Sequence, residues 1–116
     1  MDAPATEIKT GTGLVTLINV YPTTPETQGK LLDLMARMTS DAVVMQPGFV
    51  SANLHASRDG LRIVNYAQWE SSDAFQAMRG DPACRRYMEE IEALTTPDVH
   101  VYDVVSTAHP ATRISR

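Results

Sequence analysis

Two extended apolar runs in the middle of the chain are separated by only three residues, Arg58, Asp59 and Gly60. The runs cover residues 49–57 and 61–70 and are rich in β-branched and aromatic side chains. Asp-Gly between such runs is a strong signal for a tight β-hairpin, because both residues tolerate the backbone angles of the turn. The pair therefore predicts two adjacent antiparallel strands, and the other elements have to be arranged around them.

Strand and helix patterns alternate on either side of this hairpin. Residues 14–21, LVTLINVY, and residues 99–106, VHVYDVVS, have the composition of a first and a last strand. Thr23 and Glu26 have the spacing of a capping box at the start of a helix. The helical pattern that follows them ends at Pro47-Gly48. The apolar residues at helical spacing in this first helix are Leu31, Leu34, Met35, Met38, Ala42 and Met45.

The second helical stretch is predicted to consist of two pieces. Ser71 or Ser72 caps a short helix that Gly80 breaks, and Asp81-Pro82 starts another helix that is closed before Pro97. The apolar side chains of these two helices are Phe75, Met78, Cys84, Tyr87, Met88, Ile91 and Leu94.

The resulting order β-α-β-β-α-β is the ferredoxin-like, split βαβ arrangement of the α+β class. We expect a domain over residues 14–107, a flexible leader over 1–13 and a flexible tail over 108–116. The first and last strands carry apolar side chains on both faces, whereas two helices cover only one face of a sheet. A second copy of the chain is the simplest cover for the other face, so we expect a homodimer.

Charge and composition exclude several classes of function. The net charge is -4 at pH 7 and the ten basic residues form no run, so nucleic acid is not an expected partner. No apolar run is long enough to cross a bilayer, and the N-terminal residues lack the pattern of a signal peptide. We therefore expect a cytoplasmic protein without a membrane partner. Cys84 is the single cysteine, so an intrachain disulfide is impossible.

Two amides and the chain's only tryptophan are the main candidates for a site. Side chains alternate along a strand, so Asn65 and Trp69 lie on one face, roughly 13 Å apart, with Ala67 between them. Asn19 and Tyr21 share a face of the first strand. Because a buried unpaired amide costs about 1–3 kcal/mol, each Asn needs a partner. That partner is a neighbouring backbone group, a group across the sheet or a flat aromatic ligand.

Other kinds of chemistry lack their usual residues. His55, His100 and His109 do not have the spacing of metal ligands, so we expect no metal. Nucleotide-binding glycine motifs and a nucleophile elbow are absent from the sequence. Cys84 lies beside two arginines in a predicted helix, where a buried structural cysteine is more common than a reactive one.

The base for a proton transfer is not assigned. A two-residue turn at Asp59-Gly60 places His55 opposite Val64, on the face away from Asn65, whereas one additional loop residue would reverse that orientation. Asp103 alternates with valines near the end of the last strand and is expected to be solvated.

The stretch PGFVSANLHASRDGLRIVNYAQWESSDAF, residues 47–75, resembles the antibiotic biosynthesis monooxygenases. It is most similar to the actinorhodin-type anthrone monooxygenases of aromatic polyketide pathways, through PGF, HASRDG and VNYAQWES. This resemblance implies a dimeric α+β barrel. It also implies that O₂ oxidises an anthrone-type polyketide to its quinone, with no flavin, heme or metal as cofactor.

The resemblance also implies roles for individual residues. Asn65 and Trp69 match an Asn-x-x-x-Trp pair and Asn19 matches a first-strand asparagine, so these three are the expected catalytic residues. The amides would stabilise an enolate and the indole N–H would assist the peroxide. The expected substrate-binding residues are Phe75, Met78 and Tyr21. The actinorhodin-type enzyme has a tyrosine in place of Phe75, and its arginine on a later helix has no secure counterpart here.

Three other functions remain open at this stage. A quinol monooxygenase would act on small quinols with the same residues. A heme-degrading relative would need a ligating histidine in the second helical region, and residues 71–94 contain none. A dimeric ligand-binding or stress-response barrel would use Asn65 and Trp69 only to line a pocket.

Overall fold

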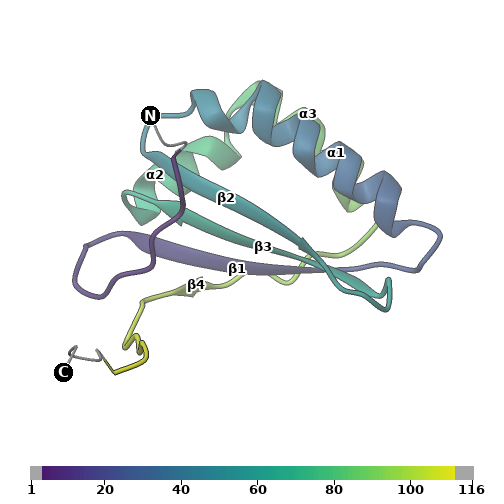
Figure 1. The fold of residues 1–116 in the computed structure, drawn as a ribbon. Coiled ribbons are helices and arrows are strands. Elements are labelled where there is room, and N and C mark those ends of the chain that lie inside the picture. The colour runs from purple at the N-terminus through teal and green to yellow at the C-terminus, as the bar shows by residue number, and fades with distance from the viewer. Residues whose placement is uncertain (1–3, 112–116) are drawn as a thin grey trace.

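The computed structural model describes residues 4–111, so residues 1–3 of the expected leader and 112–116 of the expected tail lie outside it. The predicted α+β order and the two-piece second helix are both confirmed (Figure 1). The elements are β1 (Val15–Pro22), α1 (Gln28–Asp41), a 3₁₀ turn (Val43–Met45), β2 (Phe49–Ala56), β3 (Arg62–Trp69), α2 (Ser72–Arg79), α3 (Pro82–Glu92) and β4 (Val101–Tyr102).

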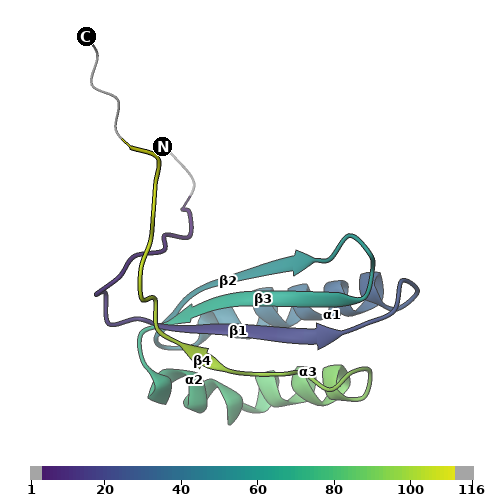
Figure 2. The ribbon, with the colours of Figure 1, turned by 90° about the horizontal axis from the view of Figure 1, so that it is seen from below.

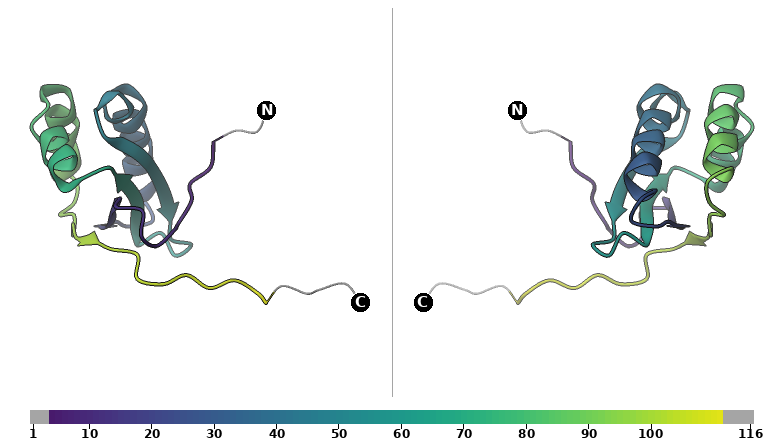
Figure 3. Two further views of the ribbon diagram at one scale, coloured as in Figure 1. Left: turned by 90° about the vertical axis from the view of Figure 1, so that its left-hand side faces the viewer. Right: turned by 90° about the vertical axis from the view of Figure 1, so that its right-hand side faces the viewer.

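The four strands form one antiparallel sheet in the order β2-β3-β1-β4. All helices lie on one face of this sheet, with α1 on one side and the α2–α3 pair on the other (Figure 3). Two clusters of apolar side chains fill the space between helices and sheet, one around Trp69 and the other around Ile63. The core therefore lies entirely on the helix side of the sheet.

The central hairpin has the predicted register. His55 pairs with Val64, and the Ser57 N–H donates to the Arg62 carbonyl at 3.1 Å to close the turn. Gly60 has a φ of +80°, the left-handed conformation that favours glycine at this position. The turn thus fixes the register of the two central strands, and Thr23 contacts it through a hydrogen bond from its N–H to the Leu61 carbonyl at 2.9 Å.

The start of α1 differs from the prediction. The helix begins at Gln28, and Thr23 does not cap it; instead the Thr23 hydroxyl donates to the carbonyl of Gly60 at 2.7 Å. The Thr24 N–H donates to the Thr27 hydroxyl at 2.9 Å, which stabilises a separate turn before the helix. The helix also ends earlier than predicted, at Asp41, and Met45 is 76% exposed. The Thr23 hydroxyl therefore bonds to the hairpin turn and does not form the predicted capping box with Glu26.

The last strand and the end of α3 are shorter than predicted. Only Val101 and Tyr102 of residues 99–106 pair with β1. After β4 the chain leaves the body of the domain, on the same side as the N-terminal segment (Figure 2). Val105 is 88% exposed, so nothing within residues 4–111 covers it. Helix α3 ends at Glu92, which leaves Leu94 outside the helix and 43% exposed.

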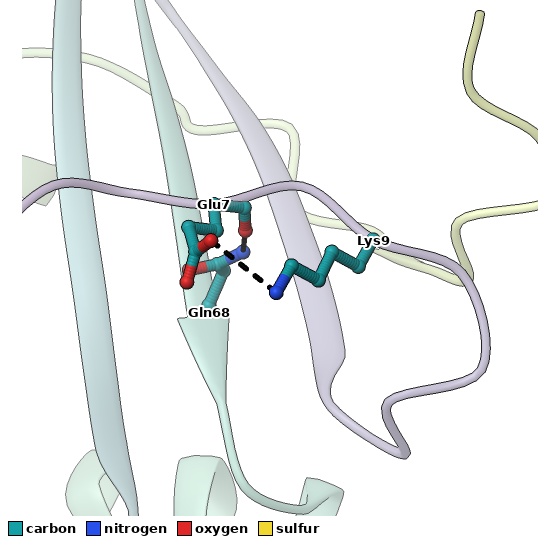
Figure 4. A network of polar contacts seen from close by, with 3 residues as sticks. All are labelled: Glu7, Lys9 and Gln68. Atoms are coloured by element: carbon teal, nitrogen blue, oxygen red, sulfur yellow. Dashed lines mark hydrogen bonds and ion pairs between the residues drawn. The ribbon is translucent and has the colours of Figure 1, made fainter.

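The face of the sheet opposite the helices carries half-buried apolar and polar side chains. Ile18 and Tyr66 are paired there across β1 and β3. The Gln68 amide donates to the Glu7 carbonyl at 2.7 Å, and Lys9 forms an ion pair with Glu7 (Figure 4). Part of the N-terminal segment thus contacts this face. Within residues 4–111 no helix has the length and apolar character that a membrane span requires.

Candidate active site

A cavity of about 300 Å³ lies between the helices and the sheet, above β1 and β3. Its lining is mainly apolar. All six residues predicted for a site contribute to this lining: Asn19, Tyr21, Asn65, Trp69, Phe75 and Met78. The strands supply the first four because their inward faces alternate with period two, and α2 supplies the last two from one side of its helix.

Asn65 has one fixed protein partner. Its Oδ1 accepts a hydrogen bond from the Asn53 backbone N–H at 3.2 Å. A backbone N–H only donates, so this contact defines which end of the carboxamide is oxygen. The Asn65 Nδ2 has no hydrogen-bond partner among the described residues and remains available as a donor.

Asn19 lies directly opposite Asn65 in the pairing of β1 with β3. It is only 6% exposed, and its Oδ1 is buried without a hydrogen-bond partner within residues 4–111. Buried acceptors are almost always paired in native proteins, and exceptions concentrate at functional sites. Asn65 therefore offers a free donor to the cavity, and the neighbouring Asn19 carries a buried oxygen for which the described protein supplies no partner.

Trp69 is held between two other aromatic rings. It makes edge-on contacts with Phe49, at a centroid distance of 5.4 Å, and with Phe75, at 6.1 Å. These T-shaped contacts are the favoured geometry for aromatic pairs and fix the orientation of the indole. Its N–H forms no hydrogen bond with another described residue, although the side chain is 2% exposed.

Arg79 lines the same cavity and was not predicted as a site residue. Its guanidinium lies over the Phe75 ring, with Cζ 5.8 Å from the ring centroid. Burial raises the pKa of Tyr21, and the Asn19 amide and the Arg79 charge offset part of this rise. The sequence contained one usable signal: Arg79 follows Phe75 by four residues, so both lie on one face of α2.

Three residues weighed from the sequence lie elsewhere. His55 is exposed on the opposite face of β2, where its Nδ1 is 3.0 Å from the Asn53 carbonyl. Asp103 is exposed after β4. Cys84 is fully buried, and burial together with neighbouring Asp81 raises its pKa to about 11, which disfavours the reactive thiolate. No group of His, Cys, Asp or Glu in the described part of the chain is arranged as a metal site.

The sequence matches a known family and a characterised relative. Residues 14–90 match the sequence pattern of the antibiotic biosynthesis monooxygenase family. The chain is 43% identical over 84 residues to tetracenomycin-F1 monooxygenase of Streptomyces glaucescens, which covers 72% of this chain and 75% of that protein.

Solved structures show the same fold. One is a monooxygenase from the gene ActVA-Orf6 of Streptomyces coelicolor, in complex with nanaomycin D. It is 32% identical with a TM-score of 0.74, and the match covers 84% of this chain and 92% of that one. Another is SnoaB of Streptomyces nogalater, described as a cofactor-independent oxygenase. It is 27% identical with a TM-score of 0.72, and the match covers 81% and 95% of the two chains.

Proposed function

The chain belongs to the antibiotic biosynthesis monooxygenase family, and from this premise we propose that it oxidises a polycyclic aromatic polyketide of the anthrone type to the quinone. The oxidant is O₂, and no flavin, heme or metal takes part. Support comes from the relatives, which include a monooxygenase of tetracenomycin F1 and a cofactor-independent oxygenase.

The cavity has the character that this substrate class requires. Small-molecule sites are mostly apolar, with a few convergent polar groups that fix orientation. Here the polar groups include the two amides on the sheet, the Tyr21 hydroxyl and the Arg79 guanidinium, and the other polar lining residues are Thr39, Glu92 and Thr96. The single observation that carries the proposal is the pairing of a free donor on Asn65 with an orphaned buried acceptor on Asn19.

Each polar group has a defined part in the proposed reaction. The anthrone methylene loses a proton to form an enolate, and Asn65 Nδ2 donates a hydrogen bond to the enolate oxygen. Such a preorganised donor contributes about 2.7–4 kcal/mol to transition-state stabilisation. Asn19 Oδ1 accepts a hydrogen bond from a phenolic hydroxyl of the substrate. The apolar lining excludes water, which strengthens both contacts.

The substrate itself supplies the electrons. The enolate transfers one electron to O₂, and the resulting radical pair combines to form a C–O bond at the former methylene carbon. The Trp69 N–H, which only donates, hydrogen-bonds to this peroxide. The peroxide takes up a proton, which replaces the one lost on enolate formation, and the remaining hydrogen leaves that carbon as a second proton while the O–O bond breaks. One oxygen atom becomes the new carbonyl of the quinone and the other leaves as water.

The test uses chelator-treated protein with emodin anthrone in air. We expect quinone absorbance to rise faster than in buffer, with one O₂ consumed for each quinone formed. Asn65→Asp keeps an oxygen for the Asn53 N–H but removes the donor, so kcat/KM falls about 10²- to 10³-fold. Trp69→Phe keeps the ring packing without the N–H, and we expect a fall of at least about tenfold.

The control is thermal unfolding, because both variants are designed to retain the melting temperature of the parent protein within a few degrees. A rate equal to the buffer control would refute the proposal. If the protein then still bound the quinone product, the cavity would belong to a ligand-binding module. Unchanged rates in both variants would remove the residue assignments while leaving the activity.

A further inference from the structure

We propose that Arg79 selects, among the aromatic substrates proposed above, those that carry an anionic oxygen at the edge of the ring system. A carboxylate and an ionised phenol both have this chemistry. The inference rests on the proposed function for its substrate class, but it concerns a different part of the cavity from the reacting oxygen.

Arg79 is the only cation that lines the cavity, judged over the described residues. The only carboxylate in the lining is Glu92, and no carboxylate within residues 4–111 is at ion-pair distance from the Arg79 guanidinium. The guanidinium is always ionised at physiological pH. The cavity thus contains one positive charge that has no direct ion-pair partner among the described residues, with Glu92 as the one negative charge on the same lining.

The guanidinium is also held in place before a ligand arrives. Its position over the Phe75 ring is a cation–π contact, which restricts the swing of the long side chain. Its charge acts on the Tyr21 hydroxyl, which lies on the sheet side of the cavity beside Asn19. Arg79 is an exposed residue that also lines the cavity, so its guanidinium is accessible to a ligand bound there.

The shape of the group favours an anionic oxygen over a neutral one. A guanidinium presents parallel N–H donors that match the two oxygens of a carboxylate. The cavity that Arg79 lines is mainly apolar, so an anion bound inside it is less screened from the guanidinium than an anion on an open surface. Because Arg79 projects from α2 while Asn19 and Asn65 project from the sheet, it positions the substrate and does not act on the reacting carbon.

A matched pair of substrates tests this role. Rhein anthrone and chrysophanol anthrone differ only in a carboxylate that replaces a methyl group. We expect the parent protein to prefer rhein anthrone about tenfold in kcat/KM, mainly through a lower KM. Arg79→Gln removes this preference, and Arg79→Lys retains part of it because the charge remains without the planar fork.

The matched control is Arg85→Gln, an exposed arginine on α3 that does not line the cavity, and its preference should equal that of the parent. Equal kcat/KM values for the two anthrones in the parent protein would overturn the inference. So would an Arg79→Gln variant that keeps the preference or that loses activity equally on both anthrones.

A binding measurement separates this inference from the proposed function. Quenching of the fluorescence of Trp69, the only tryptophan, reports binding of the quinones rhein and chrysophanol without any turnover. If neither anthrone is oxidised, the proposed function fails. Tighter binding of rhein by the parent than by Arg79→Gln would still support the role of Arg79, and equal affinities would overturn it.

Discussion

Asn19 and Asn65 are the same residue type in register across two strands, yet their hydrogen bonding differs. Asn65 has a backbone partner for its oxygen, whereas the Asn19 oxygen is buried without one in the described structure. An unsatisfied buried acceptor costs about 1–3 kcal/mol of stability. The unpaired oxygen lowers the stability of the fold, so its benefit has to lie in function, which agrees with a ligand-binding role for Asn19.

This difference predicts opposite effects of one substitution at two positions. Asn19→Leu removes an unpaired acceptor and adds apolar volume, so we expect the free energy of unfolding to rise by about 1 kcal/mol. Asn65→Leu leaves the Asn53 N–H unpaired, so we expect a fall of about 1–2 kcal/mol. Urea unfolding with unchanged m-values measures both. Equal destabilisation by the two variants would mean that the Asn19 oxygen has a partner in solution.

At the scale of the element, α2 positions three of the cavity residues: Phe75, Met78 and Arg79. The helix has only eight residues, so its stability depends on its ends. Ser71 accepts a hydrogen bond from the Ala74 N–H at 3.0 Å. Gly48 allows β2 to approach α2, because its φ is +82° and a Cβ there would lie 2.5 Å from the Ala74 Cβ.

Neighbouring serines provide a matched test of this cap. Ser71→Ala removes the hydrogen bond to the helix, so we expect a loss of about 1 kcal/mol of stability and a higher KM for the substrate as α2 frays. Ser72→Ala changes an exposed residue inside the helix with no cap contact, so its effect should stay within about 0.5 kcal/mol. Chemical denaturation and steady-state kinetics measure the two quantities. Similar losses in the two variants would contradict the assignment of Ser71 as the cap.

At the scale of the whole molecule, the helices leave one face of the sheet open. Ile18 and Tyr66 are only half-buried there, and the Tyr66 hydroxyl is buried without a partner among residues 4–111. Val50, at the start of β2, is 41% exposed beside Thr16 and Gln68. Apolar surface of this kind favours association, and a second copy with the same face is the proposed partner.

A homodimer makes a direct prediction for the mass in solution. We expect light scattering coupled to gel filtration to give twice the chain mass of 12.7 kDa. Ile18→Glu places a charge at the centre of the open face, so the dimer should dissociate while circular dichroism keeps the α+β spectrum. Ala36→Glu, on the exposed side of α1, is the control and should remain dimeric. A monomeric parent protein would refute the proposed interface.

The sequence by itself determined the element types, the hairpin register and the shared face of Asn65 and Trp69. These features depend on local rules, namely the period of two along a strand and the Asp59-Gly60 turn, which act over a few residues. The family resemblance identified the kind of protein, and the six residues expected to form a site all line one cavity.

Only the tertiary structure decided the rest, because each remaining feature depends on which elements pack together. Thr23 has the spacing of a helix cap but contacts the distant Gly60 carbonyl, so α1 begins later. Residues 99–106 have strand composition, yet a strand needs a neighbour, and no backbone hydrogen bond joins residues 103–106 to β1. The spacing of Phe75 and Arg79 places both on one face of α2, but only the packing of α2 against the sheet shows that this face lines the cavity with Tyr21 of β1.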